Sequence, residues 1–218
     1  EGDYNIAIGT RTLADNTTAD NNTAIGYNAL TANTTGASNT AVGSQTLVDL
    51  TTADECTSIG QSAGNNITTG RRNTSVGAYA NTVNTTGEHN TVIGYEAEPS
   101  GADVDNEFTL GCGHIDNLRC NDTSISSLSD ERDKTNIVDI PLGIDFINTV
   151  RPVSFDWNRR NGTFAGIKGF GFIAQELKVA ANATDYADHM RLVHDNNPDL
   201  LEADPMKMFP VLVKAIQE

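Results

Sequence analysis

Hydrophobic and polar positions repeat with a fixed period over the first half of the chain. A pentapeptide that begins as Asn5-Ile6-Ala7-Ile8-Gly9 returns every seventeen residues. Its glycines are Gly9, Gly26, Gly43, Gly60, Gly77, Gly94 and Gly111. A Thr-Thr pair between the pentapeptides keeps the same register, as at Thr17-Thr18, and indicates one turn in every repeat. A fixed period of this length is typical of stacked-coil architectures.

Each repeat is too short to bury its own apolar residues, so identical coils are expected to stack. We therefore predict a parallel β-roll or β-helix over residues 1–112, with two short strands in each coil. The repeated glycine is expected at a positive φ or at a close approach of two backbones. Leu13, Leu30 and Leu47 are expected inside the coils. A second inward ladder is expected from the aliphatic residue before each glycine: Ile8, Ile25, Val42, Ile59, Val76, Ile93 and Leu110.

The period ends after the last coil, and a different pattern follows. Ile115, Leu118 and Ile125 indicate a short neck over residues 113–128. Beyond it, the pattern predicts an α+β domain over residues 129–218, which contains the only tryptophan. A helix is expected between Pro141 and Pro152, with its apolar face at Leu142, Phe146, Ile147 and Val150.

Two strands and a last helix complete the expected domain. Val153, Phe155 and Trp157 alternate as in a strand, a turn is expected over residues 158–162, and Phe170 and Phe172 suit a returning strand. Near the end of the chain, Phe209, Leu212, Val213 and Ile216 form one apolar stripe at helical spacing. Such a stripe favours packing against partner helices, as at the start of a coiled coil.

Composition and charge narrow the possible partners. Hydrophobic residues make up 38% of the chain and aromatic residues 6%, which is lean for a thick core. The formal net charge is −15; residues 1–128 hold 4 Lys/Arg against 15 Asp/Glu, and the remainder holds 10 against 14. Nucleic-acid binding needs a basic surface, so we expect none. No apolar run approaches the roughly 20 residues of a membrane-spanning helix, and we expect no membrane insertion.

The residue types of common cofactor and metal sites are scattered. Cys56, Cys112 and Cys120 are widely spaced, without a CxxC pair or a nearby histidine at metal-ligand intervals, so they are expected to be small buried residues. His89, His114, His189 and His194 have no Ser or Cys at a diagnostic interval, which argues against a Ser-His-Asp site. We expect no metal and no cofactor.

The repeated pentapeptide resembles a known head domain. It is similar to the Asn-x-Ala-Ile-Gly repeats of trimeric autotransporter adhesin heads, over residues 5–111. The resemblance implies a left-handed parallel β-roll that assembles as a trimer. The repeats of those heads are usually shorter than seventeen residues, so handedness and loop geometry stay open here. The repeat is also compatible with the shaft of a phage fibre.

A second resemblance covers residues 129–218. Ser129-Asp130-Glu131-Arg132-Asp133-Lys134-Thr135-Asn136-Ile137 is similar to the start of the intramolecular chaperone auto-processing domain at the C-termini of phage endosialidases, tailspikes and fibres. Three further motifs follow in the expected order: Ile147-Asn148-Thr149-Val150-Arg151-Pro152-Val153-Ser154-Phe155-Asp156-Trp157, Gly171-Phe172-Ile173-Ala174-Gln175-Glu176, and the terminal helix from Pro210 to Glu218.

The chaperone resemblance implies self-cleavage before Ser129. In such domains the serine attacks the carbonyl of the preceding bond, here Leu128-Ser129, and a lysine, here Lys134, acts as its base. Lysine has a pKa near 10.4 in water, so only about 0.04% is neutral at pH 7 and burial is needed to favour the neutral form. We expect alignment and burial of the pair only in the assembled trimer. Possible supporting residues are Asp130, Arg132, Asn136 and Glu176.

Arg132 is expected to lower the pKa of Lys134 or to hold the oxyanion. Asp130 and Asp133 would act in the opposite direction if they lay close to Lys134. Glu176 and Gln175 are expected to be structural. Read without the resemblance, residues 129–132 are an ordinary helix cap followed by charges.

The favoured hypothesis is a homotrimeric viral tail fibre or tailspike protein whose last domain drives folding and then cuts itself off. It implies a host cell-surface receptor, with a glycan favoured, together with other virion tail proteins as partners. The shaft would reside in the virion tail after assembly in the host cytoplasm. Alternatives are the C-terminal part of a glycan-degrading tailspike enzyme, whose active site would lie upstream, and a bacterial trimeric adhesin.

Overall fold

The computed structural model describes residues 2–115, 117–119, 129–158 and 165–218. The chain forms two compact units, Glu1–Asp116 and Asn117–Glu218. The second part of the expected neck, residues 120–128, lies outside the described residues together with Ile125, Cys120 and Leu128. So does most of the turn expected at residues 158–162.

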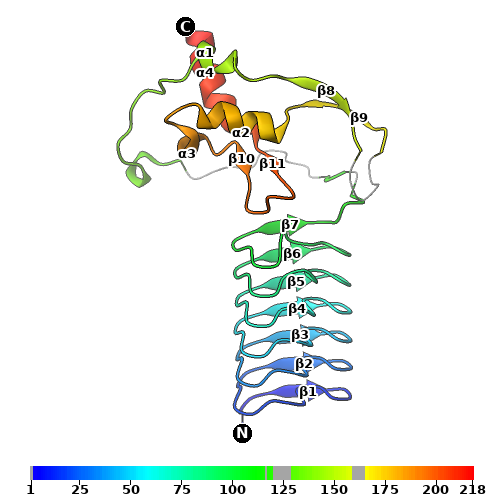
Figure 1. The fold of residues 1–218 in the computed structure, drawn as a ribbon. Helices are drawn as coiled ribbons and strands as arrows, with labels where there is room; N and C mark the ends of the chain where they lie inside the picture. Colours follow the sequence, from blue (N-terminus) through cyan, green and yellow to red (C-terminus); the bar gives the residue numbers. More distant parts are fainter. Residues whose placement is uncertain (1, 116, 120–128, 159–164) are drawn as a thin grey trace. The chain divides into compact units, whose positions relative to one another are not determined.

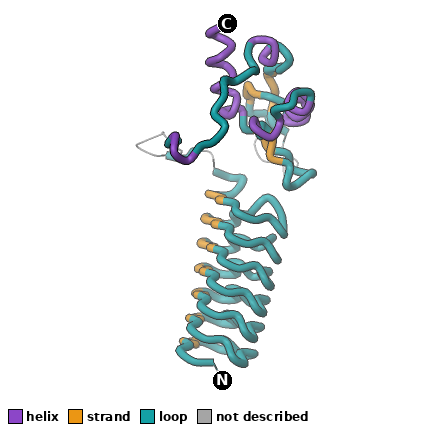
Figure 2. Tube along the Cα trace, turned by 90° about the vertical axis from the view of Figure 1, so that its left-hand side faces the viewer, coloured by secondary structure: helices purple, strands orange, loops and turns teal. Residues whose placement is uncertain are grey.

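The first unit is a parallel β-solenoid, as predicted. One three-residue strand per coil contributes to a seven-stranded sheet in sequence order (Figure 1). The strands are β1 Ile6–Ile8, β2 Thr23–Ile25, β3 Thr40–Val42, β4 Thr57–Ile59, β5 Thr74–Val76, β6 Thr91–Ile93 and β7 Phe108–Leu110. Each residue pairs with the one seventeen positions later, as Ala24 does with Ala41. The strands therefore stack in register along one side of the roll (Figure 2).

The expectation of two strands per coil is wrong, because the stretch after each glycine turns instead of extending. Leu30 and Leu47 are fully buried, as expected, but they adopt φ values of 50° and 49°. The residues two positions earlier, Asn28 and Gln45, also have a positive φ. Because every second residue here has a positive φ, the chain forms turns in this stretch. Bonds to neighbouring coils, such as Leu30 N–H to the Thr46 carbonyl at 3.1 Å, hold those turns in place.

The expected inward aliphatic ladder is also wrong. The residue before each glycine faces outward: Ile8, Ile59 and Leu110 are 59%, 43% and 50% exposed. A strand of three residues points only its middle side chain inward. In the five inner strands, β2 to β6, that position is occupied by a fully buried small residue or valine: Ala24, Ala41, Ser58, Ser75 and Val92. At this position the interior holds a small residue or a valine, while larger buried side chains such as Leu30 and Leu47 come from the turns after the glycines.

The repeated glycine meets both expectations. Gly43 has a φ of 143°, and a Cβ on it would overlap the carbonyl group of Gly60 in the next coil. The same relation links Gly26 to Gly43 and Gly60 to Gly77. A side chain at this column would therefore force adjacent coils apart.

A column of buried asparagines supplies side-chain bonds between coils. Asn39 illustrates the pattern: its Oδ1 accepts from the Cys56 N–H at 2.9 Å, and its Nδ2 donates to the Ala53 carbonyl at 2.8 Å. Asn22, Asn73 and Asn90 make equivalent bonds. The asparagine amide therefore forms hydrogen bonds with backbone N–H and carbonyl groups that would otherwise be unpaired in the interior.

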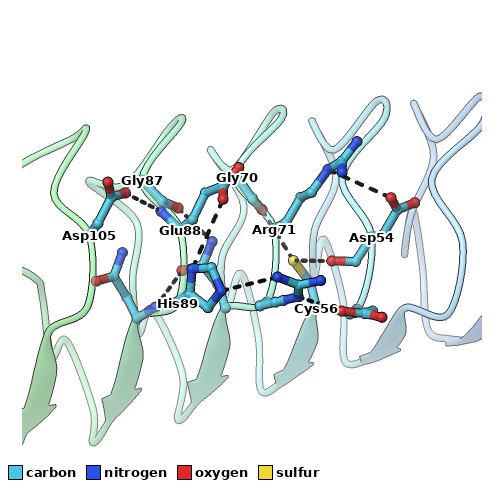
Figure 3. A network of polar contacts seen from close by, with 12 residues as sticks. Asp54, Cys56, Gly70, Arg71, Gly87, Glu88, His89 and Asp105 are labelled. Carbon is cyan, nitrogen blue, oxygen red and sulfur yellow. Dashed lines mark hydrogen bonds and ion pairs between the residues drawn. The ribbon is translucent and has the colours of Figure 1, made fainter.

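Cys56 interrupts this column. Its Sγ donates to the Gly70 carbonyl at 3.3 Å, next to a charged face with ion pairs and hydrogen bonds between coils (Figure 3). Burial raises the pKa of the Cys56 thiol to about 11. The thiol is therefore protonated at neutral pH, and the expectation that Cys56 is a small buried residue is confirmed.

The second unit is a small α+β region with a C-terminal helix, as predicted. Its elements are η1 Glu131–Asp133, α1 Ile144–Ile147, β8 Val153–Asp156, β9 Lys168–Gly171, α2 Ala174–Asn182, α3 Ala187–Met190, β10 Val193–His194, β11 Glu202–Ala203, η2 Pro205–Met208 and α4 Phe209–Gln217. Strands β8 and β9 form one antiparallel pair, and β10 and β11 form another. The helix α1 is a single turn, shorter than the segment between the two prolines.

One cluster of apolar residues forms the core of this unit. It consists of Phe146, Leu177, Ala181, Met190, Leu192, Met208 and Val211, with Leu142, Ile147 and Val150 packed against it. The expected stripe on the last helix lies largely outside this core, because Phe209 and Ile216 are 61% and 85% exposed. Val211, which was not part of that stripe, is the buried residue of α4.

Candidate functional site

The candidate site is a tight turn at the start of residues 129–218. Asp130 is extended, with φ −67° and ψ 137°, and its Oδ1 accepts the Arg132 N–H at 2.9 Å. Backbone bonds from Asp133 N–H to the Asp130 carbonyl and from Lys134 N–H to the Glu131 carbonyl close the 3₁₀ turn η1. A capping aspartate followed by such a turn reverses the chain within a few residues.

This reversal brings Ser129 and Lys134 together. Lys134 Nζ lies 2.6 Å from Ser129 Oγ and 3.1 Å from the Ser129 carbonyl oxygen. The two residues expected to act as nucleophile and base are thus in direct contact, five positions apart in the sequence. This spacing of a hydroxyl and an amine is short enough for proton transfer between them.

Arg132 does not contact the pair. Its Nε and Nη2 donate to Asp130 Oδ1 and Oδ2 at 3.0 and 2.6 Å. This bond holds the pKa of the Asp130 carboxyl below its usual value. The guanidinium is therefore bound to Asp130 in the same turn. The sequence had suggested a role for it beside Lys134 or at the oxyanion.

The site is open in the single chain. Residues 129–141 are all exposed, Lys134 included. The sequence predicted alignment and burial of the pair together, upon assembly; in the single chain the pair is aligned but not buried. Leu128, which would carry the scissile carbonyl, lies outside the described residues.

The remaining candidate residues, Asn136 and Glu176, form no hydrogen bond with Ser129 within the described part of the chain. Asn136 has a φ of 54°, a conformation that asparagine tolerates well. Glu176 accepts a bidentate bond from Arg151, with Arg151 Nε to Glu176 Oε2 at 3.0 Å, and this bond lowers the pKa of the Glu176 carboxyl. Arg151 and Glu176 both line an open groove of about 810 Å³ beside α1 and α2. The ion pair joins two of the recognised motifs and supports a structural role for Glu176.

One contact was missed by the sequence reasoning. Cys112 Sγ lies 3.6 Å from His114 Nδ1, and Cys112 is only half-buried, so the expectation of a buried cysteine without a histidine neighbour is wrong there. A spacing of two residues was the available signal. Within the described ranges, no three His, Cys, Asp or Glu side chains gather as a metal site would require.

Comparison with known proteins supports a chaperone domain at this turn and beyond. Residues 129–189 match the family described as "Chaperone of endosialidase", a family of self-cleaving peptidases. The match begins at Ser129 and includes the turn, the hairpin β8–β9 and α2. No curated protein and no solved structure matches the chain. Among the helices of the described residues, none is long and apolar enough to span a bilayer.

Proposed function

We propose that residues 129–218 are an intramolecular chaperone that cleaves the chain before Ser129, using Ser129 as nucleophile and Lys134 as base. The observation that carries the proposal is the 2.6 Å contact between Lys134 Nζ and Ser129 Oγ at the first residue of the family match. The reaction is a single turnover within one chain. It uses no cofactor and no metal.

The chemistry follows from the position of the serine on the leaving side of the bond. Ser129 Oγ adds to the Leu128 carbonyl carbon while the neutral Lys134 amine takes the hydroxyl proton. The proton passes to the Ser129 nitrogen as the peptide C–N bond breaks, which leaves Leu128 as an ester on Oγ. Water then hydrolyses the ester. The products are a carboxylate at Leu128 and a free amine and hydroxyl at Ser129.

Lys134 must lose its proton before it can act, and this requirement explains why an exposed pair would wait for assembly. Water stabilises the ammonium form, whereas a low-dielectric surrounding favours the neutral amine. Packing of further copies over residues 129–141 would remove that water. Cleavage would then follow trimer formation and would not release an unfolded shaft.

Exposed apolar surfaces in both units support a homotrimer. The outward column before the glycines runs the length of the sheet, with Ile8 paired to Ile25 and Ile25 to Val42. In α4, Leu212 and Val213 are each 40% exposed and Ile216 is 85% exposed. Single chains rarely leave such continuous apolar stripes in water, so identical neighbours are the natural partners. Continuation of α4 as a coiled coil belongs to the same proposal.

The family match and the β-solenoid together favour a phage tail fibre or tailspike. On this proposal the shaft binds a host cell-surface receptor, favoured to be a glycan, and other virion tail proteins, and it resides in the virion tail after assembly in the host cytoplasm. A glycan-degrading tailspike is the second candidate, with its active site upstream of these residues. A bacterial trimeric adhesin ranks last, because the chaperone match has no place in that reading.

Denaturing mass measurement of the freshly expressed chain tests the proposal. Wild type should give two products, residues 1–128 and a fragment whose first residue is Ser129. Ser129→Ala and Lys134→Ala should each give one uncut chain, because either the nucleophile or its base is missing. Sedimentation should show trimers for all three proteins.

Ser154→Ala and Lys168→Ala are matched controls, since they remove the same side chains from exposed positions on the hairpin. Both should be cut like wild type. Cleavage of Ser129→Ala at the wild-type rate, or a new N-terminus other than Ser129, would show the mechanism to be wrong. A stable monomer at micromolar concentration would exclude the trimer.

A further inference from the structure

The hydrogen bonds that shape the Ser129–Lys134 contact all join residues of one hexapeptide. Asp130 caps the turn, Asp133 and Lys134 close it through backbone bonds, and Lys134 Nζ returns to Ser129. These bonds span at most five residues. Alignment of the pair is therefore encoded locally, in contrast to the expectation that it appears only in the trimer.

Asp130 is the side chain on which this turn depends. Its Oδ1 accepts both the Arg132 N–H and Arg132 Nε, and its Oδ2 accepts Arg132 Nη2. The carboxylate thus fixes the backbone at the start of η1 and ties down the arginine of the same turn. Because a cap satisfies a backbone N–H that the first turn cannot pair internally, its loss lowers the population of the turn.

We propose that Asp130 is the positioning residue of the reaction: its carboxylate holds the turn that places Lys134 Nζ on Ser129 Oγ. This inference rests on the proposed self-cleavage and deepens it. Asp130 acts through Lys134 and needs no contact with the scissile bond. Its role differs from the electrostatic one considered from the sequence, in which an acid near Lys134 would favour the charged amine and oppose the reaction.

The other acids of the turn provide a contrast. Glu131 and Asp133 carry the same charge at neighbouring positions, but within the described residues no hydrogen bond of their side chains is found. If negative charge alone mattered, all three acids would act alike. If the cap matters, only Asp130 should affect the rate. Arg132 lowers the pKa of the Asp130 carboxyl, so this bond persists at neutral and mildly acidic pH and is lost only as the pH falls through that lowered value.

On this proposal, local sequence and assembly contribute different requirements of the reaction. The hexapeptide supplies alignment, while the trimer supplies the surroundings that favour a neutral Lys134. The pH dependence of cleavage should therefore report the environment of Lys134, and substitutions at Asp130 should change the maximal rate without moving the pH midpoint.

The test measures single-turnover cleavage of the refolded full-length chain over a range of pH. Asp130→Ala should lower the maximal rate roughly 2- to 30-fold, the range expected from loss of a helix cap. Asp130→Asn and Asp130→Ser keep a capping oxygen but lose the ion pair with Arg132, so they should cut faster than Asp130→Ala and stay within about fivefold of wild type. Glu131→Ala and Asp133→Ala are the matched controls and should also cut at the wild-type rate. The pH midpoint should be the same in every variant.

Several results would overturn the proposal. One is an Asp130→Ala variant that forms trimers and cuts at the wild-type rate. Another is an Asp130→Asn variant as slow as Asp130→Ala, or a midpoint displaced in both, because charge and not capping would then be responsible. Should Asp130→Ala fail to fold, Arg132→Met loosens the same carboxylate and should slow cleavage roughly 1.5- to 5-fold; a wild-type rate there would also count against the idea.

Failure of the underlying reaction gives a different pattern. If Ser129→Ala is cut as wild type is, the proposed self-cleavage is wrong whatever Asp130 does. If Ser129→Ala and Lys134→Ala are uncut while Asp130→Ala is unaffected, the self-cleavage stands and only the positioning role is lost.

Discussion

The two units of this chain are stabilised in opposite ways. The interior of the roll combines small residues such as Ala24 with leucines such as Leu30, and its backbone and asparagine hydrogen bonds repeat from coil to coil. The second unit has one apolar cluster around Phe146 and leaves large side chains exposed, with Phe170 at 91% and Val138 at 79%. The roll pairs its backbone groups by its own repetition and exposes one apolar column before the glycines, whereas the second unit exposes large apolar side chains on several of its elements.

This difference bears on how each unit can form. The bonds between coils join residues about fourteen to twenty positions apart, so a coil gains little until the next coil is in place. Loop-closure entropy must be overcome before such contacts form, which makes solenoid nucleation slow and exposes strand edges to aggregation. A domain that brings chain ends together would relieve this step, and it could be discarded once the coils have stacked.

Removal of residues 129–218 should produce the largest effect. A chain that ends at residue 128 should aggregate when it is expressed or refolded, because its coils have no nucleus. The same shaft, obtained by cleavage after folding, should stay soluble and keep its circular dichroism spectrum, since its persistence then depends on the unfolding rate. Soluble, folded shaft from the truncated gene would contradict the proposed chaperone role.

Substitution of a column glycine should have the next largest effect, and it tests the coil spacing directly. In Gly43→Ala, the new Cβ meets the Gly60 carbonyl at a backbone φ of 143°. Strain of this kind costs about 1–3 kcal/mol, and the overlap adds to it, so we expect a loss of more than about 3 kcal/mol in the free energy of unfolding of the roll. Urea denaturation followed by circular dichroism measures it.

Gly101→Ala is the control within the same unit. A Cβ there would meet only Val104 Cγ1 among the described residues, at 3.3 Å. The denaturation midpoint should change little. Equal losses in the two variants would mean that the glycine column does not set the distance between coils.

The smallest expected effect concerns the break in the asparagine column. Cys56→Asn should offer its Oδ1 to the Asn73 N–H and its Nδ2 to the Gly70 carbonyl, as Asn39 does one coil earlier. A buried hydrogen bond contributes about 1 kcal/mol, so the roll should gain roughly that amount in thermal or urea denaturation. The reciprocal change, Asn39→Cys, should cost a similar amount. A lower midpoint for Cys56→Asn would show that the site lacks room for the amide.

The repeat made the solenoid, its glycines and the inward leucines predictable. The period identifies equivalent positions, and a glycine or leucine column has few alternative explanations. The period could not show which residue of each Thr-Ala-Ile strand points to the interior. Alanine and isoleucine are both apolar, and a three-residue strand offers no further alternation. The turns at Leu30 and Leu47 were equally hidden, since leucine rarely adopts a positive φ and no local rule announces it.

At the candidate site, the two residues that lie in contact could be named from the sequence, and their surroundings could not. Ser129 and Lys134 were expected from a resemblance, and the structure places them in contact. The engagement of Arg132 by Asp130 could not be read from the sequence, because a guanidinium can reach several acids in this segment. Exposure of Lys134 depends on which chains pack around it, a property that a single sequence does not contain.

The direction of the bonds in the roll has a mechanical consequence. Bonds such as Thr23 N–H to the Asn39 carbonyl at 2.8 Å run from one coil to the next, parallel to the direction in which the coils stack. A pulling force along that direction therefore acts on the coils one after another instead of sharing the load among all of them. Each coil that yields would release seventeen residues, an extension of about 55 Å. A fibre built in this way would lengthen in equal steps under tension and would dissipate energy at each step.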